Sequence, residues 1–280
     1  MSEPESQQIS PSRQDHGLWA TLAKTHAAGT ALPYHAHRSG QLVFAIQGVM
    51  LVETAQARWT IPPQRALWVP AGQTHAIQMA SATEMRTVYC RPELLAQCGS
   101  FARHGEVHAV AASPLIKELV LGLFDGSFDP ATHHLMVSLL LRTLQQTPGL
   151  PTWLPMPADE GLRRAVDLVL KTGHWQLPLH HLASAATMSE RSFSRRFTAE
   201  VGLSFRAWRQ RARIISSLDL LASDASIKAI AHALRFESPA AYIASFRELL
   251  GCTPNAFRQG RQETGSSGTP ALLHGPPPPP

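Results

Sequence analysis

The sequence predicts an α+β protein of two domains, an N-terminal β-barrel of the jelly-roll type with accompanying helices and a C-terminal all-α domain. Three observations predict this division. Between Trp19 and Tyr89, apolar and polar residues alternate in short runs separated by turn residues, as in antiparallel strands. From residue 159 to residue 262, apolar residues recur at helical spacing. The prolines of TPGLPTWLPMP lie between these regions and predict a linker over residues 147–158.

The other boundaries follow from composition and periodicity. Residues 1–16 are polar and acidic and residues 263–280 end in a run of prolines, so both tails are predicted to be disordered. Residues 17–146 form the first domain, which ends in two predicted helices beginning near Ser113 and Pro130. The second of these helices carries leucines on more than one face. This pattern indicates either burial within the chain or pairing with the same helix of another subunit.

The composition excludes several classes of protein. With 44% hydrophobic and 16% charged residues over 280 positions, the chain is typical of a globular protein rather than a disordered one. It contains no apolar run of about 18 residues, which a membrane span needs, and its N-terminus lacks the pattern of a signal peptide. Three cysteines without CxxC spacing suit a reducing compartment. We therefore expect a cytoplasmic protein that does not enter a membrane.

Residues 179–202 predict a helix, a turn and a second helix. Ser189 is a good N-cap for the second helix, because its hydroxyl can accept a hydrogen bond from a backbone N–H in the first turn. Phe193 and Phe197 lie four residues apart and therefore share an inward face. The outward face of that helix carries Arg191, Ser194 and Arg195.

Residues 226–251 repeat this design. Ser226 and Ser238 can each cap a helix, and Pro239 follows at the first helical position, where the missing N–H costs nothing. Between the two units, residues 205–221 predict one amphipathic helix of roughly 25 Å. With its flanking turns, such a connector could hold two reading helices about one DNA turn apart, roughly 34 Å.

Charge distribution supports the same interpretation. Residues 159–262 hold 15 Lys and Arg against 9 Asp and Glu, whereas residues 1–158 hold 10 of each kind. The excess positive charge therefore lies on the part that carries the two helical units, which is typical of a surface that binds nucleic-acid phosphates. We expect the partner of this domain to be double-stranded DNA.

Two segments, LASAATMSERSFSRRFTAEVGLSFRAWRQRAR and IAHALRFESPAAYIASFRELLGCTPNAFR, closely resemble the DNA-binding domain of AraC/XylS-type bacterial transcription regulators. The resemblance covers roughly 100 residues and both units. One position departs from it, because the family usually has glycine in the second turn where this chain has Arg235. A residue with a Cβ disfavours a left-handed turn, so this turn is predicted to be strained or shaped differently.

The resemblance also implies which residues contact DNA. Arg191, Ser194 and Arg195 match the base-contacting positions of the family, and arginine suits the two acceptors of guanine. The second reading helix offers mainly proline, alanine and isoleucine on its outward face, so it is predicted to read few bases. Contacts to the DNA backbone are expected from Ser189, Arg196, Arg206, Ser238 and Arg247.

The first domain contains two further motifs, GTALPYHAHRSGQLVFAIQG and PAGQTH. These resemble the two motifs of the cupin barrel, a superfamily in which two histidines and a glutamate of the first motif join a histidine of the second at a metal. Here the corresponding residues are His35, His37, Gln41 and His75. Glutamine therefore replaces the glutamate, and Met79 stands in place of a usual asparagine.

Two interpretations of this histidine group remain open. His35 and His37 lie two apart on one strand and so face the same side, and with His75 they could hold a divalent metal such as Zn, Fe, Ni or Mn. Alternatively, the histidines form a polar, ligand-contacting cluster without metal. The lost carboxylate favours the second interpretation, and it makes sensing or structure rather than catalysis the expected role of any metal.

Taken with the resemblances, the sequence predicts a DNA-binding transcription regulator without enzymatic activity, whose cupin-like domain binds a small molecule or a metal. The family resemblance favours a homodimer. An alternative is a metal-dependent cupin enzyme, a dioxygenase or isomerase, with a DNA-binding appendage. A third is a module that occupies DNA and senses nothing.

Overall fold

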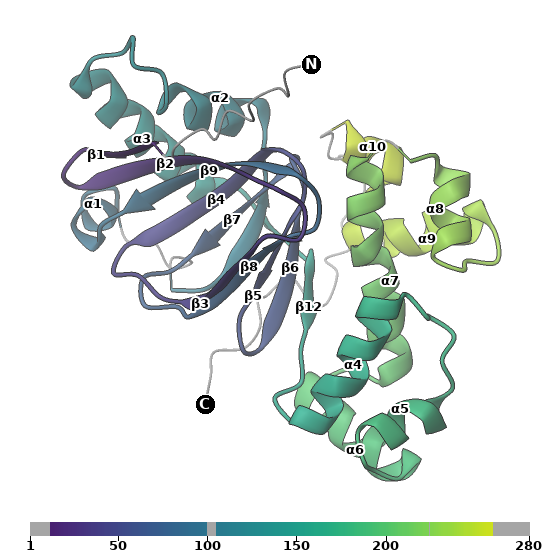
Figure 1. The fold of residues 1–280 in the computed structure, drawn as a ribbon. Coiled ribbons are helices and arrows are strands. Elements are labelled where there is room, and N and C mark those ends of the chain that lie inside the picture. Colours follow the sequence, from purple (N-terminus) through teal and green to yellow (C-terminus); the bar gives the residue numbers. More distant parts are fainter. Residues whose placement is uncertain (1–11, 100–104, 224, 260–280) are drawn as a thin grey trace, which may run out of the picture.

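The computed structural model describes residues 12–99, 105–223 and 225–259. It forms two domains, a barrel of two facing sheets and a helical domain beside it (Figure 1). The larger sheet has the strand order β1-β2-β9-β4-β7-β10-β11 and the smaller one the order β12-β6-β5-β8-β3. The strands are β1 (Ser12–Asp15), β2 (Trp19–His26), β3 (Ala31–His35), β4 (Gly40–Gln47), β5 (Met50–Glu53), β6 (Ala57–Ile61), β7 (Arg65–Val69), β8 (His75–Met79), β9 (Thr83–Cys90), β10 (His108–Ala111), β11 (Gly149–Leu150) and β12 (Trp153–Pro155).

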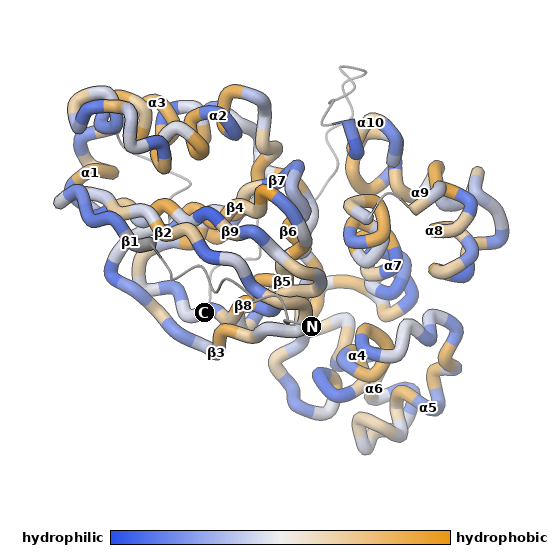
Figure 2. The backbone as a smooth tube through the Cα atoms, turned by 45° about the horizontal axis from the view of Figure 1, so that its top comes forward, coloured by the Kyte–Doolittle hydropathy of each residue, from blue (hydrophilic) through white to orange (hydrophobic). Residues whose placement is uncertain are grey.

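The pleat of the strands gives the barrel two separate cores. Side chains that point between the sheets, including Val52, Trp59 and Ile77, are fully buried against one another. On its other face the larger sheet packs against helices α1 (Pro92–Gln97), α2 (Pro114–Gly122) and α3 (Pro130–Gln146). Figures 1 and 2 show α2 and α3 along this face, away from the helical domain. The predicted jelly-roll barrel with helices is therefore confirmed.

Burial within the chain explains part of the leucines of helix α3. Val137, Leu140 and Leu144 are buried against the larger sheet. Leu135 and Leu139 lie on the opposite side and are 69% and 47% exposed. One face of α3 is thus part of the core of this chain, and the other leaves leucines in solvent.

The predicted linker is not a free tether. Within residues 147–158, β11 pairs with β10 of the larger sheet and β12 pairs with β6 of the smaller one. Proline fixes φ at a value that a strand accepts as well as a linker, and β12 is an edge strand, where proline is tolerated. Trp153 and Leu154 are buried, which anchors this segment to the barrel.

The N-terminal boundary also differs from the prediction. Residues 12–15, expected to be disordered with the rest of residues 1–16, form β1 and pair with β2 over its first half. All four residues of β1 are polar, so the sequence shows no apolar alternation there. The strand forms because β2, which follows after a short turn, supplies its hydrogen-bond partners. Residues 1–11 of that tail and the predicted tail at 263–280 lie outside the described residues.

The helical domain has the predicted double arrangement. Its helices are α4 (Glu160–Thr172), α5 (Leu179–Ala185), α6 (Glu190–Val201), α7 (Phe205–Ala222), α8 (Ile227–Ala233), α9 (Pro239–Leu250) and α10 (Pro254–Arg258). The hydroxyls of Ser189, Ser226 and Ser238 each accept a backbone N–H three residues ahead, as predicted for N-caps. Helix α7 joins the unit of α5 and α6 to the unit of α8 and α9, and Figure 1 shows the two units near its opposite ends.

The turns within the two units share one backbone feature. Thr187 in the first turn and Arg235 in the second have φ angles of 57° and 58°. Both are therefore left-handed, a conformation that glycine adopts at much lower cost than a residue with a Cβ. The second turn keeps the left-handed shape, with arginine where the resembling family usually has glycine. Within the described residues, no helix is both long and apolar enough to cross a membrane.

Candidate functional site

The outward face of α6 is presented to solvent as predicted. Phe193 and Phe197 are fully buried and meet the rings of Phe205 and Trp208, which fixes the rotation of the helix about its axis. The opposite face then carries exposed Arg191 and Arg195 and half-buried Ser194.

The outward face of α9 is poor in hydrogen-bonding groups. Tyr242 and Phe246 are buried, and the Tyr242 hydroxyl donates to Ser217 Oγ at 3.0 Å inside the core. Ala240 and Ala244 are exposed and Ile243 is half-buried. Only small or apolar side chains therefore stand where α6 has arginine.

The residues expected at the DNA backbone lie at the ends of these helices. Ser189 and Ser238 sit at the N-caps of α6 and α9, where backbone N–H groups point outward. Arg206 is exposed in the first turn of α7, and Arg247 is exposed on α9. Arg196 is more than half exposed and pairs with Asp159 at 3.7 Å, so it already has one partner within the chain.

The arginines of α7 do not all face the same way. Arg211 is only 6% exposed, and it donates to the carbonyl oxygens of Trp153 (2.8 Å) and Pro151 (3.1 Å) in the barrel. Burial lowers the pKa of Arg211 to about 10, which leaves it charged at neutral pH. Arg211 therefore belongs to the contact between the two domains and not to the basic surface expected to face DNA. A sequence signal existed, because Arg211 lies three residues after Trp208 and four before Ile215, on the apolar stripe.

The three predicted histidines meet at one end of the barrel. Their ring centroids lie 4.4 Å (His35–His75), 5.2 Å (His37–His75) and 6.1 Å (His35–His37) apart. In each ring Nδ1 lies within hydrogen-bonding distance of a backbone carbonyl oxygen, at 2.8 Å for His35, 2.5 Å for His37 and 2.9 Å for His75. A neutral ring that donates through Nδ1 carries its lone pair on Nε2.

The arrangement therefore favours Nε2 as the ligand atom of each ring, and His37 Nε2 would exchange its contact with Gln41 Oε1 for the metal. One candidate ligand atom from each ring lies within 4.8 Å of the other two. The pKa of His75 is lowered to about 4, mainly because the ring is buried, so the ring is neutral at physiological pH. The Nε2 atom of His75 is buried without a hydrogen-bond partner among the described residues. A buried acceptor of this kind is costly unless something binds it.

Gln41 lies beside this group, as its place in the motif predicted. It is 2% exposed on β4. Its amide oxygen lies 2.7 Å from His37 Nε2, and its amide nitrogen donates to the Tyr89 hydroxyl at 3.3 Å. A pocket opens next to the histidines and is also lined by Arg38, Tyr89 and Arg91. Sequence reasoning missed these three lining residues, because β3 and β9 belong to different sheets and only the folded barrel brings their ends together.

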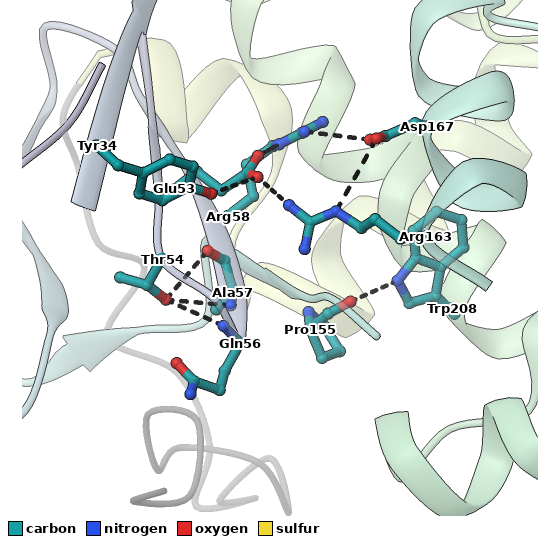
Figure 3. Close-up of polar contacts among 10 residues, drawn as sticks. All are labelled: Tyr34, Glu53, Thr54, Gln56, Ala57, Arg58, Pro155, Arg163, Asp167 and Trp208. Atoms are coloured by element: carbon teal, nitrogen blue, oxygen red, sulfur yellow. Dashed lines mark hydrogen bonds and ion pairs between the residues drawn. The ribbon is translucent and has the colours of Figure 1, made fainter. Parts of the chain in front are cut away.

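The two domains are joined by a network of charged side chains, shown in Figure 3. Glu53 at the end of β5 accepts hydrogen bonds from Arg58 Nε (2.5 Å), from the Tyr34 hydroxyl (3.0 Å) and from Arg163 of α4. Asp167 of α4 lies 3.4 Å from Arg58 and 3.9 Å from Arg163. The side chain of Glu53 is 18% exposed and those of the other charged members are 21–27% exposed, so solvent screens these ion pairs only in part.

This network lies directly behind the histidine site. Tyr34 precedes His35 on β3, and neighbouring side chains of a strand point to opposite faces. Across the sheet, His35 pairs with His75, and Glu53 pairs with Ala76, the next residue of β8. The same strands thus carry histidines on one face and the domain contact on the other.

The contact is extended by strand β12, which lies between the barrel and α7. Trp208 Nε1 donates to the carbonyl oxygen of Pro155 at 2.8 Å, as drawn in Figure 3. The guanidinium of Arg211 lies 4.8 Å from the ring centre of Trp153. Backbone, aromatic and charged groups therefore all hold the helical domain against the smaller sheet.

Comparisons with known proteins agree with both halves of this structure. Residues 21–148 match the AraC-like ligand binding domain, and residues 182–260 match a helix-turn-helix domain family. The HTH-type transcriptional regulator NimR of Escherichia coli K12 is 31% identical over 229 residues, which cover 80% of this chain and 81% of that protein. The regulatory protein PocR of Salmonella typhimurium is 34% identical over 106 residues, or 38% of this chain and 35% of its own length.

Among solved structures, the DNA-binding domain of AdpA in complex with a target DNA is 35% identical, with a TM-score of 0.33, over 35% of this chain and 90% of that one. The predicted family is confirmed by two findings. Both domains match in their order along the chain, and NimR is similar over most of the length of both proteins. The chain belongs to the AraC-type transcription regulators, with an N-terminal cupin-like ligand-binding domain and a C-terminal helix-turn-helix DNA-binding domain.

Proposed function

We propose that this regulator binds a divalent metal at His35, His37 and His75, and that the bound metal changes its affinity for DNA. One observation carries the proposal: the three Nδ1 atoms lie at backbone carbonyl oxygens, and one candidate ligand atom of each ring lies within 4.8 Å of the other two. Histidine ligands of metals are commonly oriented in this way, through a hydrogen bond from the ring nitrogen that does not bind the metal.

The donor set fits some metals better than others. Three neutral imidazoles suit Zn, Ni, Cu and Fe, whereas Mg and Ca prefer oxygen ligands. Gln41 can offer an amide oxygen but no negative charge, so the site is predicted to bind metal more weakly than one with a carboxylate. The bound ion would supply positive charge at the pocket beside Tyr89 and Arg91.

We expect Zn(II) or Ni(II) to bind the full chain with a stoichiometry of one per chain, as measured by equilibrium dialysis. His75→Ala should abolish this binding, because it removes the buried ligand that has no other partner. His134→Ala is the matched control, since His134 is exposed on α3 and should leave binding unchanged. Equal metal binding by both variants would contradict the histidine site.

The same features favour sensing over catalysis. A metal-dependent cupin enzyme is expected to hold a carboxylate at the position of Gln41, and the amide found there neither neutralises the metal nor acts as a base. We therefore propose that the barrel is not catalytic and that the chain acts on DNA in the bacterial cytoplasm.

We further propose that the two DNA-binding units have unequal tasks. Arg191, Ser194 and Arg195 would read base edges from α6, since they combine exposure with hydrogen-bonding groups. Ser189, Arg196, Arg206, Ser238 and Arg247 would contact phosphates, which position the protein without specifying sequence. The apolar outward face of α9 supports mainly backbone contact by the second unit.

The charged network offers a route from the barrel to DNA. A ligand that shifts His35 would also shift Tyr34 on the same strand, and Tyr34 hydrogen-bonds Glu53, which pairs with Arg163 of the DNA-binding domain. Coupling between two sites requires such an element with different contacts in the two states, and it is typically worth about 1–3 kcal/mol.

We also propose a homodimer formed through α3. The argument rests on exposed Leu135 and Leu139, which form an apolar strip on a helix whose other face is buried. Sedimentation should show a dimer, and Leu135→Lys combined with Leu139→Lys should shift it to monomer without unfolding the barrel. Leu168→Lys is the control, because Leu168 is an exposed leucine on α4. A double variant that sediments as the wild type would exclude this interface.

Selection of DNA from a random pool by the full chain, with and without Zn(II), tests the function as a whole. A recovered sequence motif and a metal-dependent change in affinity are expected. Binding that ignores the sequence of the duplex and the metal would contradict the proposal.

A further inference from the structure

A groove crosses the helical domain between its two reading helices. One end lies beside Ser194 and Thr198 of α6, next to Arg206 and Arg209. The same two arginines also line the larger part of the groove, which continues over α7 to Ala241 and Ser245 of α9. The charged residues along this larger part are Arg206, Arg209, Arg213, Arg235 and Glu237.

Two of these arginines are held in place by the chain itself. Arg209 donates to the carbonyl oxygen of Leu177 at 2.8 Å, and Arg213 donates to that of Leu234 at 2.9 Å. The guanidinium of Arg213 also stacks on Phe236, 3.8 Å from the ring centre. Arg213 therefore contacts the residues on both sides of Arg235 and fixes the second turn against α7.

Arg235 itself occupies a conformation that does not suit it. Its φ angle is 58°, and its side chain is exposed, so neither the backbone nor burial favours arginine over glycine here. What the side chain adds is a further positive charge along a groove that three other arginines also line.

We propose that Arg235 and the groove arginines bind the phosphate backbone of DNA where it passes α7, between the two contacted major grooves. This inference rests on the DNA-binding function of the domain. Two helices that enter successive major grooves on one side of a duplex leave the minor groove and its bordering phosphates between them. Those phosphates face α7, and the small side chains of Ala207, Ala241 and Ser245 along the groove leave room for close approach.

The test uses the full chain with Arg235→Gly. Glycine accepts the left-handed turn, so the midpoint of thermal unfolding should be equal to or above that of the wild type. Affinity should nevertheless fall by about tenfold, both for a duplex selected by the wild type and for one of scrambled sequence. The slope of log affinity against log salt concentration should become less steep by about 0.9, the value for one lost phosphate contact.

Two further variants separate charge from backbone shape. Arg235→Lys should keep the wild-type salt slope, because it keeps the charge. Thr187→Gly relieves the equivalent turn of the first unit without removing a charge, and it should leave DNA affinity unchanged.

The proposal is overturned if Arg235→Gly binds both duplexes as the wild type does. It is also overturned if the loss is confined to the selected duplex, since that outcome would make Arg235 a base-reading residue. A wild-type chain that binds neither duplex would instead contradict DNA binding itself.

Discussion

Arg195→Ala is expected to weaken binding to a selected duplex by about 1–3 kcal/mol, which is roughly 5- to 150-fold. Arg195 is exposed on the outward face of α6, whose rotation is fixed by buried Phe193 and Phe197. A guanidinium there can donate two hydrogen bonds to a guanine, and alanine leaves those acceptors unpaired. Fluorescence anisotropy with selected and scrambled duplexes measures the difference.

The specificity of this effect distinguishes base reading from charge. DNA selection by Arg195→Ala should lose its preference at one or two base pairs and keep the rest of the motif. Arg196→Ala is the matched control one residue away, and it should weaken binding to all duplexes to the same degree. An equal loss on every duplex for Arg195→Ala would contradict its role in reading bases.

Glu53→Gln is expected to remove the response of DNA binding to metal. In the wild type, Zn(II) should change DNA affinity by a factor of about 5 to 150, the usual range of coupling between sites. Without the Glu53 carboxylate, Arg163 of α4 loses its partner on β5, and Tyr34 loses its acceptor. The factor should therefore approach one, while dialysis should still find metal bound, because Glu53 lies on the opposite face from the histidines.

The control for this experiment is Glu84→Gln. Glu84 also pairs with an arginine, Arg86 at 2.6 Å, but on the barrel and away from the DNA-binding domain. It should leave the metal response intact. If Glu53→Gln responds to metal as the wild type does, the charged network does not transmit the signal.

The helical domain could be predicted closely because its signals are local. Capping predicts that the first reading helix begins after Ser189, and apolar periodicity predicts a connector over residues 205–221. The structure has Glu190–Val201 and Phe205–Ala222. The histidine site could also be anticipated, since the spacing of His35 and His37 places both rings on one side of a strand.

The domain contact could not be predicted in this way. Glu53 and Arg163 lie 110 residues apart in the chain, and nothing near either residue indicates the other. The misassigned linker has the same cause. Prolines are common in linkers and are also tolerated in edge strands, and only the distant partners β6 and β10 make residues 149–155 part of the barrel.

Strand β12 has a consequence for how two copies would meet an operator. Its backbone pairs with β6 and also accepts hydrogen bonds from Trp208 and Arg211 of α7. The segment between the barrel and the DNA-binding domain is therefore held at both domains. In the proposed homodimer, the distance between the two DNA half-sites would then be set by how the barrels pack rather than by a flexible linker. A regulator built this way can acquire targets of new spacing only by changing how its protomers meet.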